Sequence, residues 1–303
     1  MVFESLVANV PALKSAVVTL DVLHTGVIWG WFVTMNMWAK SIGTGVFLVG
    51  LYMMKRYSTS QNFFKAAIPL IGIVFIGITL LFTLLDLHQP FRFWHMFVYP
   101  HFTSVINIGS WFLNLYVALL TLMAYAVIIK KDDVLFDRLK LPGLFLAFVA
   151  TIYTAGLMGQ SNAREIWQTP TEIAQMLLAA GIGGSAAFLL TGLALSKEEK
   201  MTLAGILGLC ATLSFVIFLS EIFFAPVKSE EAEWIIHYIT HGGIAPLFYL
   251  GMLLAFIIPM ALIGLSLKTG TTKLLTIASA SALVVLWMMK HTWLVAPQMI
   301  PLS

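Results

Sequence analysis

Long stretches without a charged side chain constrain this sequence more than any other feature. These uncharged runs are 22–39, 41–54, 66–85, 93–129, 141–163, 173–196, 201–220, 234–267 and 274–289. Most reach or exceed the roughly 20 apolar residues that a bilayer-spanning helix needs. Charged residues make up only 10% of the chain and hydrophobic residues 60%, whereas a soluble domain carries about 25% charged residues. We therefore predict an integral membrane protein.

The same runs predict an all-α fold, because lipid leaves no partner for exposed backbone groups. They show no alternation of apolar and polar residues, which excludes a transmembrane β-barrel. We expect one polytopic membrane domain over residues 1–303, a bundle of eight transmembrane helices. The expected spans are 26–54, 64–86, 105–129, 141–160, 172–195, 201–223, 244–267 and 272–293.

Basic residues predict the orientation of these helices. The loops after the first, third, fifth and seventh spans carry eleven of the 17 Lys and Arg residues, and the opposite side carries Lys14, Arg92, Arg164 and Lys228. The positive-inside rule then puts both termini outside the cytoplasm. The outer loops 86–104, 161–171 and 224–243 are long, which suggests docking of a partner there. We expect no removable signal peptide, because residues 1–22 lack the charged and apolar segments of one.

Histidine and cysteine positions argue against a bound redox centre. All seven His residues fall on or near the predicted outer side, whereas a buried b-type haem needs axial ligands that face each other across helices. The single Cys, Cys210, excludes a Cys-ligated iron–sulfur cluster or zinc site. His237 and His241 have the i,i+4 spacing of a metal-ligand pair if their loop is helical. Polar surface or partner contact is the preferred interpretation, and we expect no metal.

Buried polar residues indicate where function resides. Lys40 lies eleven residues after Trp29, about 16 Å along a helix and so near the bilayer midplane. Ionisable residues at that depth are functional candidates by default, although Lys40 could instead neutralise a structural acid or reach the interface. Asn36 shares its helical face. Tyr153 has a depth matching that of Asn36, about 10 Å below the outer face; the two could bind one ligand or form an ordinary interhelical contact.

Several segments resemble NrfD-type membrane subunits. The resemblance rests on Trp29-Gly-Trp31 with Ser41-Ile-Gly43-Thr-Gly45, on Asp86-Leu-His-Gln-Pro90-Phe-Arg92-Phe-Trp94-His95, on Gly109-Ser-Trp111, on Tyr153-Thr-Ala-Gly156 and on Trp167-Gln-Thr-Pro170. The stretch from Asp86 to His95 is the specific signal, and the small-residue pattern alone is weak. Eight helices over the whole chain agree with it.

The resemblance implies a membrane subunit of a polysulfide-reductase-type respiratory complex in a prokaryotic cytoplasmic membrane. Such a subunit exchanges electrons between membrane quinone (menaquinone or ubiquinone) and an outer iron–sulfur subunit, which is linked to a molybdopterin catalytic subunit. It has no redox cofactor of its own. The implied quinone site contains Tyr153, and Asn36 where the family has a histidine. Lys40 departs from an apolar residue of the family, and Lys290 stands where an Arg is expected.

We therefore predict a quinone site and a partner interface. The quinone-binding residues are Asn36, Lys40 and Tyr153. The proton path or site support comprises Asp86, Arg92, His95, Glu221 and Lys290, of which Asp86, Glu221 and Lys290 could equally form interfacial ion pairs. The partner interface comprises His88, Trp94, Arg164, Trp167, His237 and His241.

Other functions remain open from the sequence. A proton- or ion-coupled secondary transporter could use Lys40 as its titrating group, but we find no inverted repeat. A purely structural anchor is a further alternative. An intramembrane hydrolase would need a nucleophile and a base deep in the membrane, and no histidine lies at the middle of a predicted span. The formal net charge of +3 is too small to indicate nucleic acid.

Overall fold

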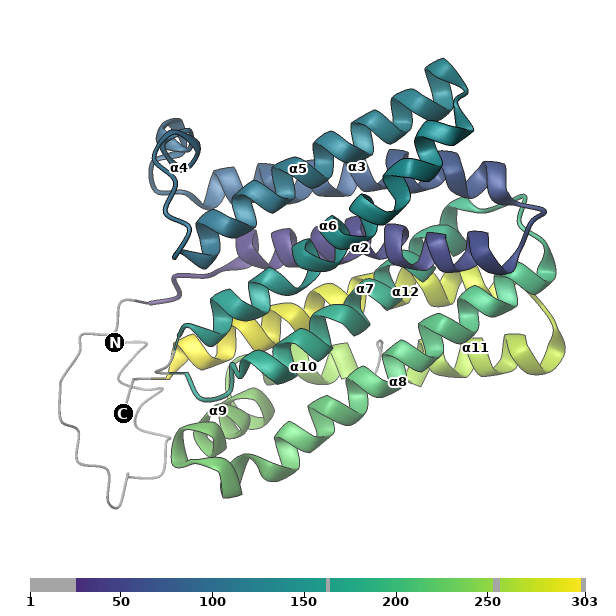
Figure 1. Ribbon diagram of the computed structural model, residues 1–303. Coiled ribbons are helices and arrows are strands. Elements are labelled where there is room, and N and C mark those ends of the chain that lie inside the picture. The colour runs from purple at the N-terminus through teal and green to yellow at the C-terminus, as the bar shows by residue number, and fades with distance from the viewer. Residues whose placement is uncertain (1–25, 162–163, 253–256, 301–303) are drawn as a thin grey trace.

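A computed structural model shows a bundle of helices over the residues it describes, 26–161, 164–252 and 257–300 (Figure 1). Seven helices in these residues are long and apolar enough to cross a membrane. They are α2 (Trp31–Arg56), α3 (Gln61–Asp86), α5 (Val105–Tyr125) continued by the π-helical turn η2 (Ala126–Lys130), α6 (Asp133–Gly159), α7 (Thr169–Thr191), α8 (Lys197–Lys228) and α12 (Lys273–Val295) continued by the 3-10 turn η4 (Ala296–Met299). The predicted all-α, multi-pass membrane fold is confirmed.

In the structure, the remaining predicted span, 244–267, contains two shorter helices. These are α10 (Ala245–Met252) and α11 (Ile258–Thr269), and residues 253–256 between them lie outside the described part. Pro259 occupies the first turn of α11, where a missing backbone N–H costs nothing. The described residues thus contain seven long spans, and α10 and α11 lie where we expected the eighth.

Two other helices are longer than expected because charged residues extend them rather than end them. Helix α6 begins at Asp133 instead of 141, since the Asp132 side chain accepts a hydrogen bond from the Leu135 backbone N–H at 2.9 Å. Helix α8 begins with a capping box in which Ser196 and Glu199 satisfy each other's backbone N–H groups. Charges at the ends of uncharged runs therefore belong to the helices and lengthen them beyond the apolar core.

The helices form two neighbouring groups that share α2. Helices α2, α3, α5 and α6 pack together on one side, and α7, α8, α11 and α12 pack on the other. Helix α2 joins them because it also packs against α7 and α12. It is the most buried span, consistent with its central place in Figure 1. The polar side chains Thr34, Asn36, Lys40, Ser41 and Thr44 of α2 are therefore buried against other helices.

Small residues allow α2 and α7 to approach closely. A Cβ added to Gly184 or Gly45 would overlap the backbone of the facing helix, and one added to Gly183 would lie 3.0 Å from the Ile42 Cα. Close backbone approach of this kind replaces the hydrophobic effect as a source of helix association in lipid. The small residues of the Ser41–Gly45 segment thus allow α2 of one group to pack closely against α7 of the other.

Helix ends from distant parts of the sequence meet at both ends of the bundle. At one end Lys65 forms an ion pair with Asp133 at 2.8 Å, and the Tyr57 hydroxyl lies 2.6 Å from that of Thr202. At the other end, the Gln298 side chain accepts hydrogen bonds from the backbone N–H groups of Ile28 and Trp29. We refer to these as the basic end and the Trp29 end, the former carrying the Lys- and Arg-rich loops.

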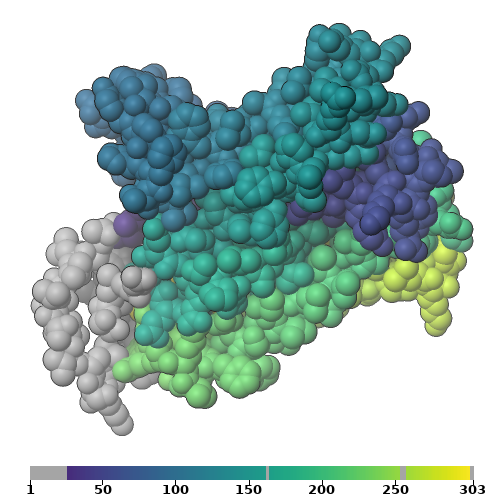
Figure 2. Space-filling view, in the orientation of Figure 1, coloured from purple at the N-terminus to yellow at the C-terminus, as the bar shows by residue number. Residues whose placement is uncertain are grey.

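The predicted loops at the Trp29 end contain short helices. Residues 87–104 hold a 3-10 turn, η1 (Pro90–Arg92), and α4 (His95–Val98), while residues 229–242 hold α9 (Glu230–His241). Figure 2 shows the segment around α4 projecting from the bundle. The two segments enlarge this end of the molecule beyond the spanning helices.

Candidate functional site

A cavity of about 270 Å³ lies at the Trp29 end between α2, α3, α5 and α6. Most of its wall is apolar, with Val33, Leu80, Leu113 and Leu157 among the lining residues. Its polar residues are Asn36, Thr83, Asp86, Ser110, Asn114, Tyr153 and Thr154. An apolar cleft with a few convergent polar groups is typical of a small-molecule site. The structure therefore brings together three residues singled out from the sequence: Asn36, Asp86 and Tyr153.

Asn36 is fixed by contacts with α3. Its amide nitrogen donates to the Thr79 carbonyl oxygen at 3.2 Å and to the Thr83 hydroxyl. An Asn side chain has two N–H donors and one oxygen acceptor, so both donors are engaged. The geometry leaves the amide oxygen as the group that can accept a hydrogen bond from a ligand.

Lys40 lies against Tyr153 and Thr154 from the interior of the bundle. Its ammonium donates to the Thr154 hydroxyl and lies 4.2 Å from the centre of the Tyr153 ring. The side chain is 1% exposed, so it neither reaches an interface nor faces lipid. A cation over an aromatic ring gains electrostatic energy when desolvated. Lys40 therefore supports the cavity wall through two of its residues, and Thr154 is a partner that the sequence did not reveal.

Gly109 of α5 provides the surface on which the Tyr153 ring packs. A Cβ at Gly109 would lie 3.0 Å from the ring Cγ and closer still to two other ring carbons. The Gly109-Ser-Trp111 motif therefore has a steric function: only glycine leaves room for the ring between α5 and Lys40.

The segment from Asp86 to Phe97 covers the cavity. Asp86 and Leu87 line it at the end of α3, and Phe93, Met96 and Phe97 line it from the region of α4. Met96 is held in place by its carbonyl oxygen, which accepts from Asn107 at 2.9 Å. The other side chains of this segment face outward: His88, Arg92, Trp94 and His95 are exposed, and Phe91 is 92% exposed. The motif thus has one face toward the cavity and another toward the surface.

Two predicted support residues lie elsewhere. Lys290 lines a second cavity, of about 60 Å³, between α2, α7, α8 and α12. Glu221 forms an ion pair with Lys228 near the end of α8, at 3.1 Å. Glu172 of α7 also lines the second cavity and was not singled out, because an acid in the first turn of a helix is common and favourable. The one signal in the sequence that could have identified Glu172 is its position two residues after the Trp167-Gln-Thr-Pro170 motif.

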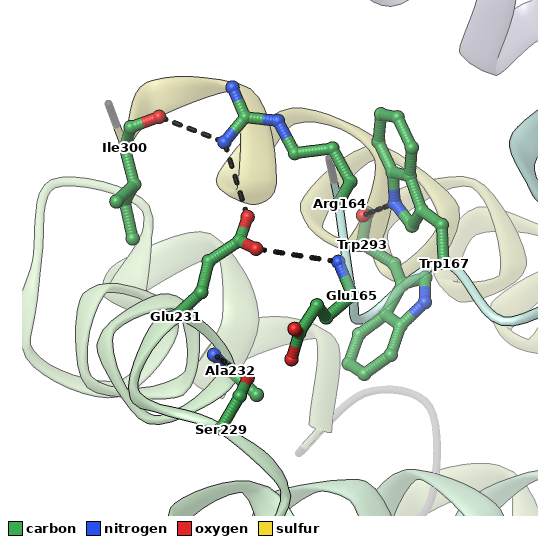
Figure 3. A network of polar contacts seen from close by, with 8 residues as sticks. All are labelled: Arg164, Glu165, Trp167, Ser229, Glu231, Ala232, Trp293 and Ile300. Atoms are coloured by element: carbon green, nitrogen blue, oxygen red, sulfur yellow. Dashed lines mark hydrogen bonds and ion pairs between the residues drawn. The ribbon is translucent and has the colours of Figure 1, made fainter. Parts of the chain in front are cut away.

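Arg164 and Trp167 hold three outer segments together, as Figure 3 shows. Arg164 donates to the Ile300 carbonyl oxygen at 2.9 Å and pairs with Glu231 of α9 at 3.4 Å. The indole N–H of Trp167 donates to the Trp293 carbonyl oxygen at 3.2 Å. The Trp167 ring also stacks on that of Trp29. Both side chains therefore contribute to the internal packing of the Trp29 end. Of the six residues predicted for the partner interface, His88, Trp94, His237 and His241 are exposed.

Replacing Arg164 by Ala is expected to destabilise the protein. Burial lowers the pKa of Arg164 and raises that of Glu231, and each charge partly offsets the effect on the other. Without Arg164 the Glu231 carboxylate, 9% exposed, loses its charged partner, which costs about 1–3 kcal/mol. Thermal unfolding should show a lower midpoint, and the deficit should shrink as pH falls from neutral, because protonation of Glu231 removes the unpaired charge.

The exposed Arg138→Ala serves as the matched control, since Arg138 lies at the basic end. It should leave the midpoint unchanged. Equal midpoints for both variants would show that the Arg164–Glu231 pair contributes nothing to stability.

Metal ligands do not cluster in the part of the chain that the structure describes. No group of three or more His, Cys, Asp or Glu side chains converges there. His237 and His241 stack at 4.8 Å on the exposed face of α9. His24 lies outside the described residues.

Comparison with known proteins supports the family that the sequence motifs resemble. The family model "Polysulphide reductase, NrfD" matches residues 22–301. The sequence is also 25% identical over 258 residues to the C subunit of the polysulfide reductase of Wolinella succinogenes, a match that covers 76% of this protein and 80% of that one. Because the family model spans nearly the whole sequence, the chain belongs to the polysulphide reductase NrfD family.

Proposed function

We propose that this chain is the quinone-interacting membrane subunit of a respiratory oxidoreductase complex. It exchanges electrons between the membrane quinone pool and an iron–sulfur subunit, which passes them to a molybdopterin catalytic subunit. The observation that carries the proposal is the cavity that joins Tyr153, Asn36 and Asp86 in an apolar wall. Membership of the family supports a subunit of a redox complex and disfavours the alternative of a transporter that uses Lys40.

The polar groups of the cavity suit a quinone or quinol head group. A quinol offers hydroxyl donors and a quinone offers carbonyl acceptors. The Tyr153 hydroxyl can donate to one oxygen, and the Asn36 oxygen can accept from a hydroxyl at the other. The apolar residues bury the ring, and Lys40 adds positive charge close to it in a medium of low dielectric constant. Asp86, at the end of α3, would support the site as a further polar group of the cavity wall.

Gly109→Ala tests the cavity without removing a polar group. The new methyl overlaps the Tyr153 ring, which must move away from its position beside Lys40. We expect quinone-linked turnover of the assembled complex to fall by about tenfold, because misplacement of a site residue by about 1 Å costs up to about 10² in rate. Turnover is measured with a soluble quinol.

Gly77→Ala is the matched control, because a Cβ at Gly77 meets no atom within 4 Å. Both substitutions favour the helix by up to about 1 kcal/mol, so helix propensity does not distinguish them. If the two variants turn over quinol equally, the cavity is not the quinone site.

The Trp29 end is the proposed docking surface of the iron–sulfur subunit, and this end would face the periplasm. The α4 segment and α9 provide exposed aromatic and His side chains there, including Trp94, Tyr99, Phe102, His237 and His241. We expect residue-specific cross-linkers placed at Phe102 and His237 to capture the iron–sulfur subunit. Capture from Lys131 or Arg138 at the basic end instead would reverse the proposed orientation.

A further inference from the structure

The second cavity contains an acid and a base that the quinone site does not use. It holds about 60 Å³ between α2, α7, α8 and α12, enough for a few waters, since about 10–15 Å³ accommodates one. Its polar lining residues are Glu172, Gln175, Ser214 and Lys290. A cavity with several polar groups holds water readily, whereas an apolar one stays dry.

Glu172 is held firmly at this cavity. It is 2% exposed, and its Oε1 accepts a hydrogen bond from the Trp293 indole N–H at 2.8 Å. Lys290 of α12 is 9% exposed and is attracted to Glu172 by their opposite charges. Charged groups inside a membrane protein are costly and commonly mark proton relays. The Trp293 bond fixes the carboxylate in position, and the Lys290 ammonium lies 3.4 Å from the Met176 Sδ at the same cavity.

The two cavities share part of their walls. Met37, Met158 and Leu294 line both. Beside the first cavity, the Lys40 ammonium donates to the hydroxyl of Thr154, one of its lining residues. Three shared side chains thus separate the two cavities, with Lys40 beside the first and Lys290 in the wall of the second.

The series continues from Glu172 toward the Trp29 end of α8. Glu172 interacts electrostatically with Glu221 and Lys228 of that helix, which pair with each other at 3.1 Å. The charged groups that act on Glu172 are thus Lys290 on α12 and Glu221 and Lys228 on α8.

We propose that Glu172 relays protons between the quinone cavity and the Trp29 end of the membrane. Oxidation of one quinol releases two electrons and two protons; the electrons pass to the iron–sulfur subunit, and the protons travel one at a time. Each proton moves from the region of Tyr153 and Lys40 to the Glu172 carboxylate at the second cavity, then past Glu221 of α8 to the outer solution. Quinone reduction runs the same route in reverse. The inference rests on the proposed function and adds to it a proton route through the second cavity.

Glu172→Gln tests the relay in the assembled complex, because glutamine keeps the oxygen that accepts from Trp293 but cannot carry a proton. We expect quinol-linked turnover to fall by about 10²-fold, the lower range for loss of a positioned proton-transfer group. The ratio of rates in H₂O and D₂O should rise above the wild-type ratio, and the pH–rate profile should change. Glu172→Asp, which restores a carboxylate, should recover part of the rate. Exposed Glu198→Gln is the matched control and should behave as wild type.

Quinone binding, measured by displacement of a labelled quinone analogue, separates the two proposals. If wild-type complex binds no quinone, the proposed function fails. If it binds quinone and Glu172→Gln turns over at the wild-type rate with unchanged isotope ratio, only the relay is overturned. Should Glu172→Gln fail to assemble, Glu221→Gln provides the second test. Slower turnover with quinone binding intact supports the relay, and wild-type turnover overturns it.

Discussion

Replacing Tyr153 by Phe is expected to lower quinone-linked turnover of the assembled complex by about 10²-fold or more. The substitution keeps the ring that packs on Gly109 and lies beside Lys40, and it removes only the hydroxyl. That hydroxyl is the proposed donor to one quinone oxygen and a group through which a proton can leave, and proton transfer by a positioned side chain contributes about 10²–10⁴-fold. Activity of the catalytic subunit with an artificial dye should be unchanged.

The exposed Tyr52→Phe is the matched control, since it makes the same chemical change on α2 away from the cavity. Loss of both quinone-linked and dye-linked activity in Tyr153→Phe would indicate a folding defect. Retention of both would show that quinone binds elsewhere, and the assignments of Asn36, Lys40 and Tyr153 would then be wrong.

Replacing Gly45 by Ala is expected to prevent the two helix groups from packing. The added methyl would lie 2.8 Å from the Gly184 backbone nitrogen and closer still to the Ala180 carbonyl. Backbone atoms of α7 cannot rotate away as a side chain can, so the helices must separate. Overpacking in a close-packed interior costs about 1–3 kcal/mol and sometimes more. We expect loss of the monodisperse peak when detergent-solubilised protein is analysed by size-exclusion chromatography.

Gly205→Ala on α8 is the control, because a Cβ there meets nothing within 4 Å. It should elute as wild type. A monodisperse Gly45→Ala protein with wild-type quinone-linked turnover would mean that α2 and α7 are farther apart than the structure shows.

The secondary structure and the membrane setting could be predicted from sequence because both depend on local composition. Uncharged apolar runs specify helices wherever lipid is the solvent, and the spans fall where expected apart from 244–267. Helix ends were less accurate, since Asp132 and Ser196 cap helices beyond the apolar runs. Depth along a helix follows from its rise per residue, and Asn36 and Tyr153, which have matching depths, line the same cavity.

Contacts between helices depend on which faces of the helices pack together. The sequence of one helix does not determine which residues of another helix it contacts. The sequence predicts Asn36 as a quinone-binding residue, and the structure adds that its N–H groups donate to Thr79 and Thr83 of α3, so that its oxygen is left for a ligand. Trp167 was expected at a partner surface and is buried against Trp29 and Trp293.

The sequence by itself determined an all-α membrane protein, the position of Lys40 along its helix and, through its motifs, the family. Only the tertiary structure decided that Lys40 faces Tyr153 and Thr154, that the Asp86 segment covers a cavity, and that Glu172 and Lys290 line one cavity inside the bundle. The physical reason is that apolar periodicity and charge act within one helix, whereas a buried polar group takes its environment from neighbours more than 100 residues away in the chain, as Lys40 and Thr154 do at a separation of 114 residues.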